Sequence, residues 1–332
     1  MPIASEKMLS ICIPTYNRAA YLSASLERLF CENEVLSGSV EVIVADNCSS
    51  DDTRIICERY QASYPNVFFY YRQSKNIGPS GNFTFLLKQA KGLFLKFQND
   101  NLILRPGAIG RMLGFIREHE SEHPVIYFGS ENNRYPPRGI YRADNCDEFL
   151  DKVSYLTTWT GGYGMWRDEV DMAVEIHDRL ADTLLQQVGV IWTLFLRNKI
   201  GYFVNESFLD MVNMPPLKKD GYNVSEVFGN NYPKILMRFV GIGMISQKAY
   251  DAELRRVYCE HVFPKYFDFY SEFSYTRGGF WQNTARYHGK WYFWMTFIKW
   301  PIFKLLGTFP FVDRIIRKLL NRRMINYSSD SR

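Results

Sequence analysis

The chain has 332 residues, enough for two domains of the usual size of about 100–200 residues. Its residues are 46% hydrophobic and 23% charged, a balance that is typical of folded globular proteins and excludes a low-complexity or fibrous chain. The formal net charge of +5 is too small by itself to indicate nucleic-acid binding, whereas the 16% of aromatic residues favours stacking surfaces for sugars or bases, or a membrane-interface belt.

Neither the cysteines nor the N-terminal residues indicate a metal, redox or export motif. None of the six cysteines stands in a Cys-x-x-Cys pair, so we expect buried free thiols in a reducing compartment. The first ten residues lack the cationic and apolar regions of a signal peptide, and no segment offers about 18 or more apolar residues without a charge. We therefore expect the chain to stay in the cytoplasm.

The first hundred residues alternate between strand-like and helix-like segments. Apolar runs of strand length, whose starts lie 31, 27 and 26 residues apart, occur at Leu9–Pro14, Val40–Ala45, Val67–Tyr71 and Leu93–Gln98. The segments between them have helical spacing of apolar residues. Strand–helix units repeated at this period predict right-handed crossovers and an α/β fold with a mainly parallel sheet covered by helices on both faces.

The pattern continues and then weakens. Pro106-Gly107 begins another predicted helix, and Val125–Gly129 reads as a fifth strand. Farther on we expect a turn at Arg134–Gly139, a flexible loop at Gly161–Gly164 and a linker at Asn213–Gly221. Helical spacing returns over residues 233–275, and the last forty residues are aromatic and basic. The sequence therefore predicts two regions, 1–215 and a helical region 216–332.

Polar clusters follow each of the first four predicted strands. They are Pro14–Asn17, Asp46–Asp52, Lys75–Gly78 and Asn99–Asn101. Ligands of open parallel sheets bind beyond the carboxyl ends of the strands, so we expect these clusters to converge on one crevice. No Gly-x-Gly-x-x-Gly follows the first strand, which argues against a nicotinamide or flavin enzyme.

These clusters and their flanking segments carry a resemblance to a known family. In order and spacing over about residues 8–120, the chain resembles the family 2 glycosyltransferases. The segments are LSICIPTYNR (9–18), VIVADNCSSD (42–51), KNIG (75–78) with Asn82, and AKG (90–92) before Asn99–Asn101. The resemblance implies an inverting enzyme of GT-A fold that uses a nucleotide-sugar donor, with its catalytic domain at 1–215. Together with the basic aromatic tail it is similar to bacterial O-antigen and surface-polysaccharide transferases, including abequosyltransferase-like enzymes of lipopolysaccharide biosynthesis.

The resemblance implies roles for residues of the crevice. Pro14, Thr15 and Tyr16 would line the nucleobase pocket, where the tyrosine ring offers a stacking face. Asp46 would accept a hydrogen bond from the base or ribose, although a turn or helix-cap role is the alternative. Lys75 would meet the donor phosphates, and the alternative is a solvated loop lysine. The implied donor site also includes Asn76 and Asn99, and Asn76 and Asn82 have turn and cap roles as alternatives.

The family usually places two aspartates where this chain has Asn99-Asp100-Asn101. A hard divalent cation takes oxygen ligands and bridges the two phosphates of the donor. By resemblance Asp100 would bind Mg²⁺ or Mn²⁺, in a site weakened by the loss of neighbouring carboxylates. The alternative is a vestigial site in which Lys or Arg side chains cover the diphosphate.

An inverting transfer needs a general base for the acceptor hydroxyl. The acids and the histidine in the right part of the chain are Asp168, Glu169, Glu175, His177, Asp178 and Asp182. We predict Asp182, which stands before an expected helix Thr183–Leu196, with a helix N-cap as the alternative. Gly161–Gly164 would form part of the sugar pocket, or a simple tight turn.

The segment Lys290–Arg323 carries eight basic residues and one acidic residue, and its first two thirds are crowded with Trp, Phe and Tyr. Such a stretch, too charged to span a bilayer, favours an interfacial anchor on anionic lipid. An aromatic core helix with a solvated basic face is the alternative, and nucleic-acid contact is a lesser one.

The sequence therefore predicts a transferase that moves a sugar from a nucleoside diphosphate to a hydroxyl of a lipid-linked glycan, at the inner face of the cell membrane. The rival hypothesis is a non-catalytic glycan- or nucleotide-binding protein on a degraded transferase scaffold. The single carboxylate of the Asn99–Asn101 cluster and the unclear base keep that rival open.

Overall fold

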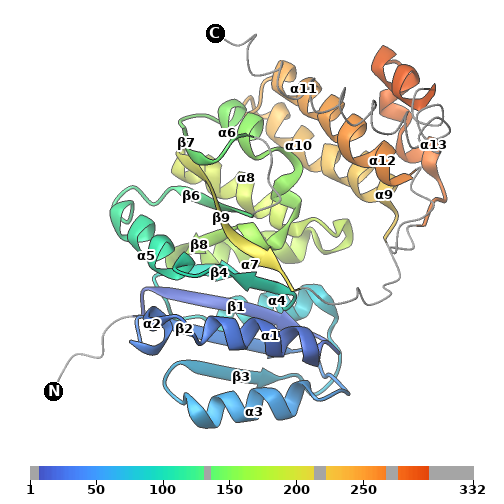
Figure 1. Cartoon of the computed structure of the whole chain (residues 1–332). Helices are drawn as coiled ribbons and strands as arrows, with labels where there is room; N and C mark the ends of the chain where they lie inside the picture. Colours follow the sequence, from blue (N-terminus) through green and yellow to red (C-terminus); the bar gives the residue numbers. More distant parts are fainter. Residues whose placement is uncertain (1–6, 131–135, 213–221, 267–275, 299–332) are drawn as a thin grey trace, which may run out of the picture. The chain divides into compact units, whose positions relative to one another are not determined.

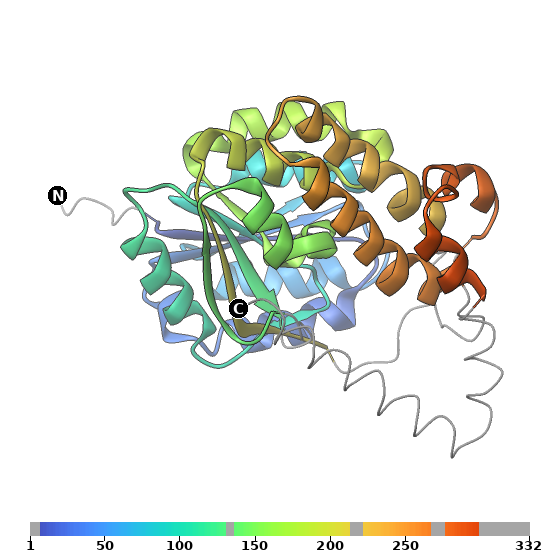
Figure 2. The ribbon, with the colours of Figure 1, turned by 90° about the horizontal axis from the view of Figure 1, so that it is seen from above.

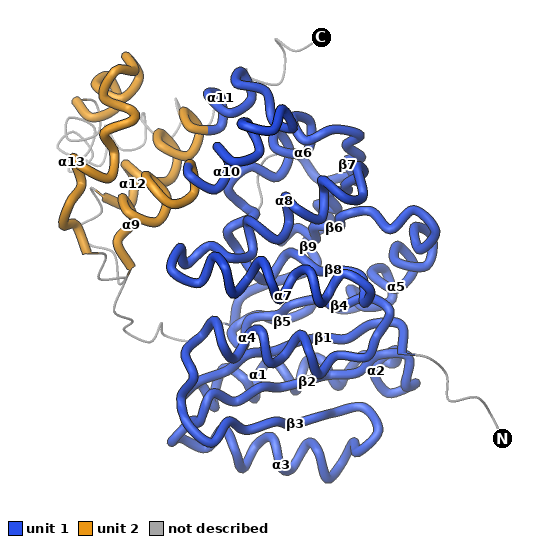
Figure 3. The backbone as a smooth tube through the Cα atoms, turned by 180° about the vertical axis from the view of Figure 1, so that it is seen from behind, with its two compact units in different colours: residues 1–216, 234–253 blue, residues 217–233, 254–332 orange. Residues whose placement is uncertain are grey.

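The computed structural model describes residues 7–130, 136–212, 222–266 and 276–298. The chain divides into two compact units (Figure 3). The first comprises residues 1–216 and 234–253, and the second comprises residues 217–233 and 254–332. Residues Lys234–Glu253, which the sequence places in the C-terminal region, thus pack with the first unit.

The first unit is built on a five-stranded sheet of order β3-β2-β1-β4-β8. Its strands are β1 (Leu9–Thr15), β2 (Val40–Asp46), β3 (Phe68–Arg72), β4 (Phe94–Phe97) and β8 (Gly164–Trp166). The first four are parallel to their neighbours, and β8 is antiparallel to β4. The four predicted strands are confirmed to within one residue at each end. Every residue of β2 is buried, as expected of a strand covered on both faces.

Helices cover both faces of this sheet (Figures 1 and 3). On one face lie α1 (Ala19–Leu29) and α3 (Thr53–Ser63), which contact each other, and on the other lie α4 (Gly78–Gln89) and α7 (Val170–Arg179). The fully buried stripe of Leu22, Leu26 and Leu29 on α1 explains its orientation, because residues three and four apart share one helix face. The predicted α/β class is confirmed.

The strand predicted at residues 125–129 is confirmed, and it belongs to a second sheet of the first unit. This strand, β6 (Val125–Ser130), pairs in parallel with β9 (Gly201–Met211) and not with the first sheet. Also paired with β9 are β5 (Leu102–Leu104) and β7 (Gly139–Ala143), and β7 and β9 run side by side in Figure 2. Strands of three residues such as β5 are too short for a periodic signal.

Further helices complete the first unit. They are α2 (Asn33–Leu36), α5 (Ala108–Glu118), α6 (Cys146–Val153), α8 (Gln186–Asn198), α10 (Tyr232–Gly241) and most of α11 (Gln247–Val257). Short 3₁₀ turns lie at Ser154–Thr158, Thr160–Gly162, Arg167–Glu169 and Ala181–Thr183. Asn145 caps α6 by accepting a hydrogen bond from the backbone N–H of Glu148.

Two local predictions were wrong. Gly161–Gly164 is not a flexible loop, because all four residues are buried and a Cβ atom on Gly162 would lie 2.4 Å from the ring of Tyr127. The glycines here allow close packing. The helix expected from Thr183 begins at Gln186, since Leu184 adopts a left-handed conformation with φ 58° that breaks the helical run.

The second unit has an aromatic core. It contains α9 (Val224–Glu226), π-helical turns at Val227–Asn231 and Tyr258–Val262, α12 (Phe263–Tyr266), α13 (Phe280–Asn283), the turn Ala285–Tyr287 and a helix over residues 291–298. Tyr258, Phe263 and Phe293 are fully buried, whereas Trp291 is 66% exposed. Within the described ranges no helix is long and apolar enough to cross a membrane. Of the segment Lys290–Arg323 that is predicted as a membrane anchor, residues 290–298 are described, and Phe293 there is buried; residues 299–323, which carry most of the basic side chains, lie outside the described residues.

Candidate active site

The candidate site lies where the strand order of the first sheet reverses. The chain runs from β1 to β2 and β3 on one side and returns to place β4 on the other side of β1. All four strands are parallel, so their carboxyl ends share one edge, and the gap between the ends of β1 and β4 is the point at which such sheets bind ligands. The four predicted polar clusters follow these four ends.

At this point Asp100 holds the loops after β1 and β4 together. Thr15 donates a hydrogen bond of 3.0 Å from its Oγ1 to Oδ2 of Asp100, and Arg18 places Nη1 2.8 Å from Oδ1. The side chains of Arg18 and Asp100 are 15% and 6% exposed. Burial raises the pKa of Asp100 above its ordinary value although the Arg18 guanidinium acts in the opposite direction.

Side-chain amides connect the loops after β1, β2 and β3. Asn17 accepts hydrogen bonds through Oδ1 from the backbone N–H of Ser50 at 2.7 Å, and its own N–H donates to Oγ of Ser49 at 2.9 Å. Asn47 donates from Nδ2 to Oδ1 of Asn76 at 2.9 Å. The φ of 52° at Asn17 explains why an asparagine stands there, since Asn tolerates the left-handed region. The predicted convergence of the clusters is thus seen in their contacts.

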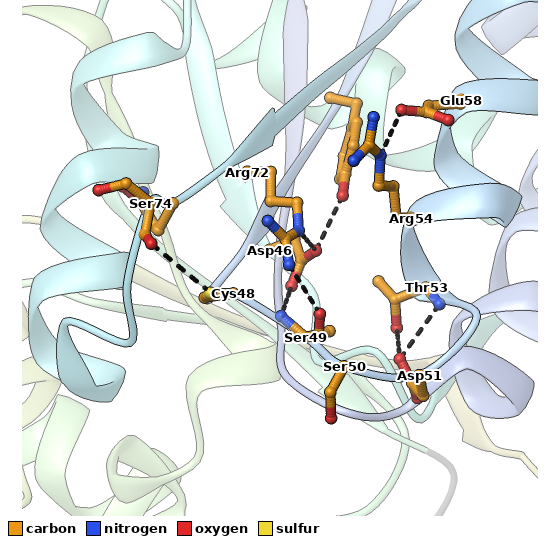
Figure 4. A network of polar contacts seen from close by, with 12 residues as sticks. Asp46, Cys48, Ser49, Ser50, Asp51, Thr53, Arg54, Glu58, Arg72 and Ser74 are labelled. Carbon is orange, nitrogen blue, oxygen red and sulfur yellow. Dashed lines mark hydrogen bonds and ion pairs between the residues drawn. The ribbon is translucent and has the colours of Figure 1, made fainter.

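Asp46 is bound within the protein (Figure 4). It is fully buried, and its Oδ1 accepts the backbone N–H of Ser49 at 2.8 Å. Its Oδ2 accepts the hydroxyl of Tyr70 at 2.8 Å and lies 3.5 Å from Nε of Arg72. Burial and this carboxylate raise the pKa of Tyr70 well above its ordinary value. These contacts fix the end of β2 between β3 and the following loop.

The other predicted donor-site residues differ in exposure. Tyr16 is 46% exposed and Lys75 is exposed, so both present their side chains to solvent beside the crevice. Asn82 is buried and donates from Nδ2 to the backbone carbonyl of Ala45 at 2.7 Å, which supports the end of β2. Asn99 accepts a hydrogen bond of 2.7 Å from Oγ1 of Thr160.

The Asn99–Asn101 cluster, as folded, does not fit a divalent cation. Both carboxylate oxygens of Asp100 are hydrogen-bonded, and the amide oxygen of Asn99 is also engaged. In the described part of the chain no three His, Cys, Asp or Glu side chains are grouped as metal ligands. A cation bound to Asp100 would have to displace the Arg18 guanidinium from the same oxygen.

Topology separates the base candidates into two groups. Trp166 at the end of β8 pairs with Phe94 at the start of β4, so Asp168 and Glu169 lie at the amino edge of the sheet, opposite the crevice. Glu169 accepts from the Trp166 backbone N–H at 2.9 Å and from Asn198 Nδ2 at 2.6 Å, and burial raises its pKa to about 7. Neither acid can reach a donor bound at the carboxyl edge.

Helix α7 begins just after Glu169, at the amino edge of the sheet, and runs along α4 toward the carboxyl edge. His177, near its end, stacks on Phe83 with ring centroids 4.5 Å apart, and burial lowers the pKa of His177 to about 4. Asp178 accepts a hydrogen bond of 3.1 Å from Thr84 in the middle of α4, and Nδ1 of His177 lies 3.3 Å from Oγ of Ser80 near the start of α4. Both side chains therefore act in packing between the two helices.

Asp182 follows directly, exposed on the turn Ala181–Thr183. It does not cap α8, whose N-cap is Leu185 without a side-chain hydrogen bond. Because α4 begins at the carboxyl edge and contacts the end of α7, this turn lies on the crevice side of the sheet.

Three residues that shape the site had no predicted role. Arg18 lies in the family-like LSICIPTYNR segment, so its position there was a usable signal. No sequence signal pointed to Arg72 or Thr160, since only the folded chain brings Arg72 beside Asp46 and Thr160 beside Asn99.

Comparison with known proteins agrees with this geometry. Residues 10–165 match the model of glycosyl transferase family 2. Abequosyltransferase RfbV of Salmonella typhimurium is 34% identical over 163 residues, 45% of this chain and 47% of that protein. A GalNAc(5)-diNAcBac-PP-undecaprenol beta-1,3-glucosyltransferase of Campylobacter jejuni is 31% identical over 105 residues, 32% of this chain and 33% of that protein. The chain spans between 13% and 47% of the length of such curated relatives.

Solved structures share the fold. Residues 1–349 of S. aureus TarS, in complex with UDP-GlcNAc, superpose with a TM-score of 0.55 at 17% identity, over 75% of this chain and 71% of that one. The mannosyltransferase PcManGT of Pyrobaculum calidifontis, in complex with GDP-Man and Mn²⁺, superposes with a TM-score of 0.52 at 10% identity, over 96% of this chain and 81% of that one. Residues 10–165 thus match glycosyl transferase family 2, the chain shares the GT-A fold, and it is similar to transferases of bacterial surface polysaccharides.

Proposed function

We propose that the chain transfers a sugar from a nucleoside-diphosphate donor to a hydroxyl group of a glycan, with inversion at the anomeric carbon. The observation that carries the proposal is the set of contacts among Thr15, Arg18 and Asp100 at the strand-order reversal of a glycosyltransferase family 2 domain. Parallel sheets bind nucleotides at this point.

The donor would lie across the carboxyl ends of β1 and β4. Pro14, Thr15 and the exposed ring of Tyr16 would face the nucleobase, and Lys75 with Asn76 would approach the phosphates from the loop after β3. In the proposed complex Asp46 does not contact the donor directly, because its carboxylate is fully buried and already accepts hydrogen bonds from Ser49 and Tyr70. Its role is to hold the loop after β2 in position.

Transfer would proceed by in-line displacement. The acceptor oxygen forms a bond to the anomeric carbon while the bond from that carbon to the diphosphate oxygen breaks, and the hydroxyl proton passes to a carboxylate. We assign this base to Asp182, because it is exposed on the crevice side while the carboxylates of Asp46 and Asp100 are engaged within the protein. The side chains around Asp100 do not fit the Mg²⁺ or Mn²⁺ that the resemblance implies, because both carboxylate oxygens already accept hydrogen bonds.

The acceptor is proposed to be a lipid-linked glycan of a bacterial surface polysaccharide. The name of the Campylobacter jejuni relative includes an undecaprenol diphosphate glycan, which supports this class of acceptor. The basic and aromatic composition of Lys290–Arg323 suits a peripheral site on anionic lipid at the inner face of the cell membrane.

A donor screen tests the proposal. Thermal unfolding is measured with UDP, GDP, CDP, ADP and dTDP, since a ligand that binds the folded state raises its apparent stability. Sugar conjugates of the bases that bind are then incubated with lipid-linked glycans, and release of nucleoside diphosphate is measured. Glycan-dependent release supports the transferase. Binding without release, for any conjugate, would favour the non-catalytic nucleotide-binding protein.

A further inference from the structure

The Arg18–Asp100 ion pair places a fixed positive charge at the point where a donor diphosphate would lie. Asp100 follows β4 and Arg18 follows β1, so the pair spans the strand-order reversal of the sheet. The side chain of Arg18 is 15% exposed, so part of it reaches solvent, whereas the side chain of Asp100 is 6% exposed.

Most hydrogen-bond donors of this guanidinium are unused. An arginine carries five N–H donors in a fixed plane. Among the described residues the contact with Asp100 is its one polar side-chain contact, and the group otherwise lies 5.8 Å from the ring centroid of Tyr21. A planar guanidinium held on one side by a carboxylate is oriented to give two parallel hydrogen bonds to phosphate oxygens on the other.

Arg18 also occupies a position that a divalent cation would need. Its Nη1 contacts Oδ1 of Asp100, and Thr15 contacts Oδ2 of the same carboxylate. A cation at Asp100 would therefore compete with a buried ion pair, in a cluster whose flanking residues are the neutral Asn99 and Asn101. Breaking a buried ion pair is costly, so the structure favours the arginine over the cation.

We propose that Arg18 binds the donor diphosphate directly and supplies the positive charge that a divalent cation supplies in related enzymes, so that diphosphate binding does not require a divalent cation. This inference rests on the proposed nucleotide-sugar site. During transfer the guanidinium stabilises charge growing on the leaving diphosphate, and Asp100 acts as a positioning residue that holds Arg18 in place.

Inorganic pyrophosphate is the probe, because it tests the phosphate site whichever base the donor carries. Its affinity for the full chain is measured by calorimetry in excess EDTA and again with Mn²⁺. The variants are Arg18→Gln, Arg18→Lys and Asp100→Asn. Arg28→Gln is the matched control, because Arg28 lies at the opposite end of α1 in an ion pair of similar burial, with Glu32.

The inference predicts binding by the wild-type chain in EDTA, weakened about 10-fold or more by Arg18→Gln and less by Arg18→Lys. Mn²⁺ should not restore the loss, and Arg28→Gln should bind like wild type. Asp100→Asn is the sharpest variant. It should keep pyrophosphate binding both in EDTA and with Mn²⁺, because the amide oxygen still accepts the hydrogen bond of Arg18 while a negative charge beside the diphosphate is removed. A metal site at Asp100 requires instead that Mn²⁺-dependent binding be lost in this variant.

Binding of pyrophosphate by the wild-type chain only with Mn²⁺ would overturn the inference and leave the transferase proposal standing. Unchanged binding by a folded Arg18→Gln chain in EDTA would overturn it too. If Arg18→Gln does not fold, as judged by thermal unfolding without ligand, the Asp100→Asn result decides. Absence of binding by any nucleoside diphosphate or pyrophosphate, with or without Mn²⁺, would reject the proposed function itself.

Discussion

Thr15 at the end of β1 donates a hydrogen bond of 3.0 Å to Asp100, which follows β4 and is 85 residues away in the sequence. The two residues meet because β1 and β4 are adjacent and parallel in the sheet. The loop that carries Asp100 is therefore positioned by the first strand of the domain.

Replacing the Thr15 hydroxyl tests this coupling. We expect Thr15→Val to lower the free energy of unfolding by about 1–3 kcal/mol, since a buried hydrogen bond to a charged group is lost. The KM for the donor should rise as well, because Asp100 then holds Arg18 less firmly. Thr15→Ser keeps the hydroxyl and serves as the control. Equal stability of the Val and Ser variants, measured by chemical denaturation, would contradict the prediction.

Asp182 is predicted to act as the general base. Asp182→Asn should reduce transfer by about 10²-fold or more, the usual scale of general-base catalysis, while donor binding stays unchanged. Stability should change little, because Asp182 is exposed and caps no helix. The control is Glu118→Gln, an exposed acid at the end of α5 that is not among the candidate bases. Normal turnover by Asp182→Asn together with loss in Asp178→Asn would move the base to the end of α7.

Glu169 is predicted to make stability fall as the pH rises. Burial raises its pKa from 4.5 to about 7, so between these values the folded chain holds a proton that the unfolded chain has released. The contribution of Glu169 is thus fully present below pH 4.5 and lost as the pH approaches 7. Unfolding of wild type and Glu169→Gln is compared across this range. The difference between their free energies of unfolding should change by about 1–3 kcal/mol over this pH range. A difference that stays constant with pH would contradict the role given to burial of Glu169.

Gly162 is predicted to be intolerant of any side chain. A Cβ atom there would lie 2.4 Å from the ring of Tyr127, so Gly162→Ala should cost about 1–3 kcal/mol by overpacking. Gly114→Ala is the matched control, because Gly114 lies exposed within α5 with no atom within 4 Å of the added Cβ. That variant should gain up to about 1 kcal/mol from helix propensity. Thermal denaturation distinguishes the two, and a neutral Gly162→Ala would show that the contact relaxes.

The basic tail is predicted to attach the protein to anionic membranes. Charge reversal to Glu should release the chain from vesicles that contain phosphatidylserine, since each basic residue contributes about 1 kcal/mol near such a surface. The residues to change are Arg314, Arg317, Lys318, Arg322 and Arg323. Phosphatidylcholine vesicles provide the control. Unchanged co-sedimentation with anionic vesicles would assign the tail to a packed helix.

The sequence by itself determined the four parallel strands of the first sheet and the edge at which their polar clusters meet. Long apolar runs such as Val40–Ala45 predict buried strands wherever they stand, because burial on both faces requires apolar residues at every position. The polar residues that follow such strands then belong to one edge, since parallel strands all end on the same side. Thr15 and Asp100 could therefore both be assigned to the crevice from their positions at the ends of β1 and β4.

Only the tertiary structure decided which side chains of that crevice are free and which are engaged. Asp46 and Asp100 look alike in the sequence as acids after a strand, yet Tyr70 and Ser49 hold the first while Arg18 and Thr15 hold the second. The strand pairing of the second sheet could not be predicted from the sequence either, because β9 pairs with strands that begin 99, 76 and 62 residues before it. Such pairings depend on contacts between distant segments, and the local periodicity of a sequence carries no information about them.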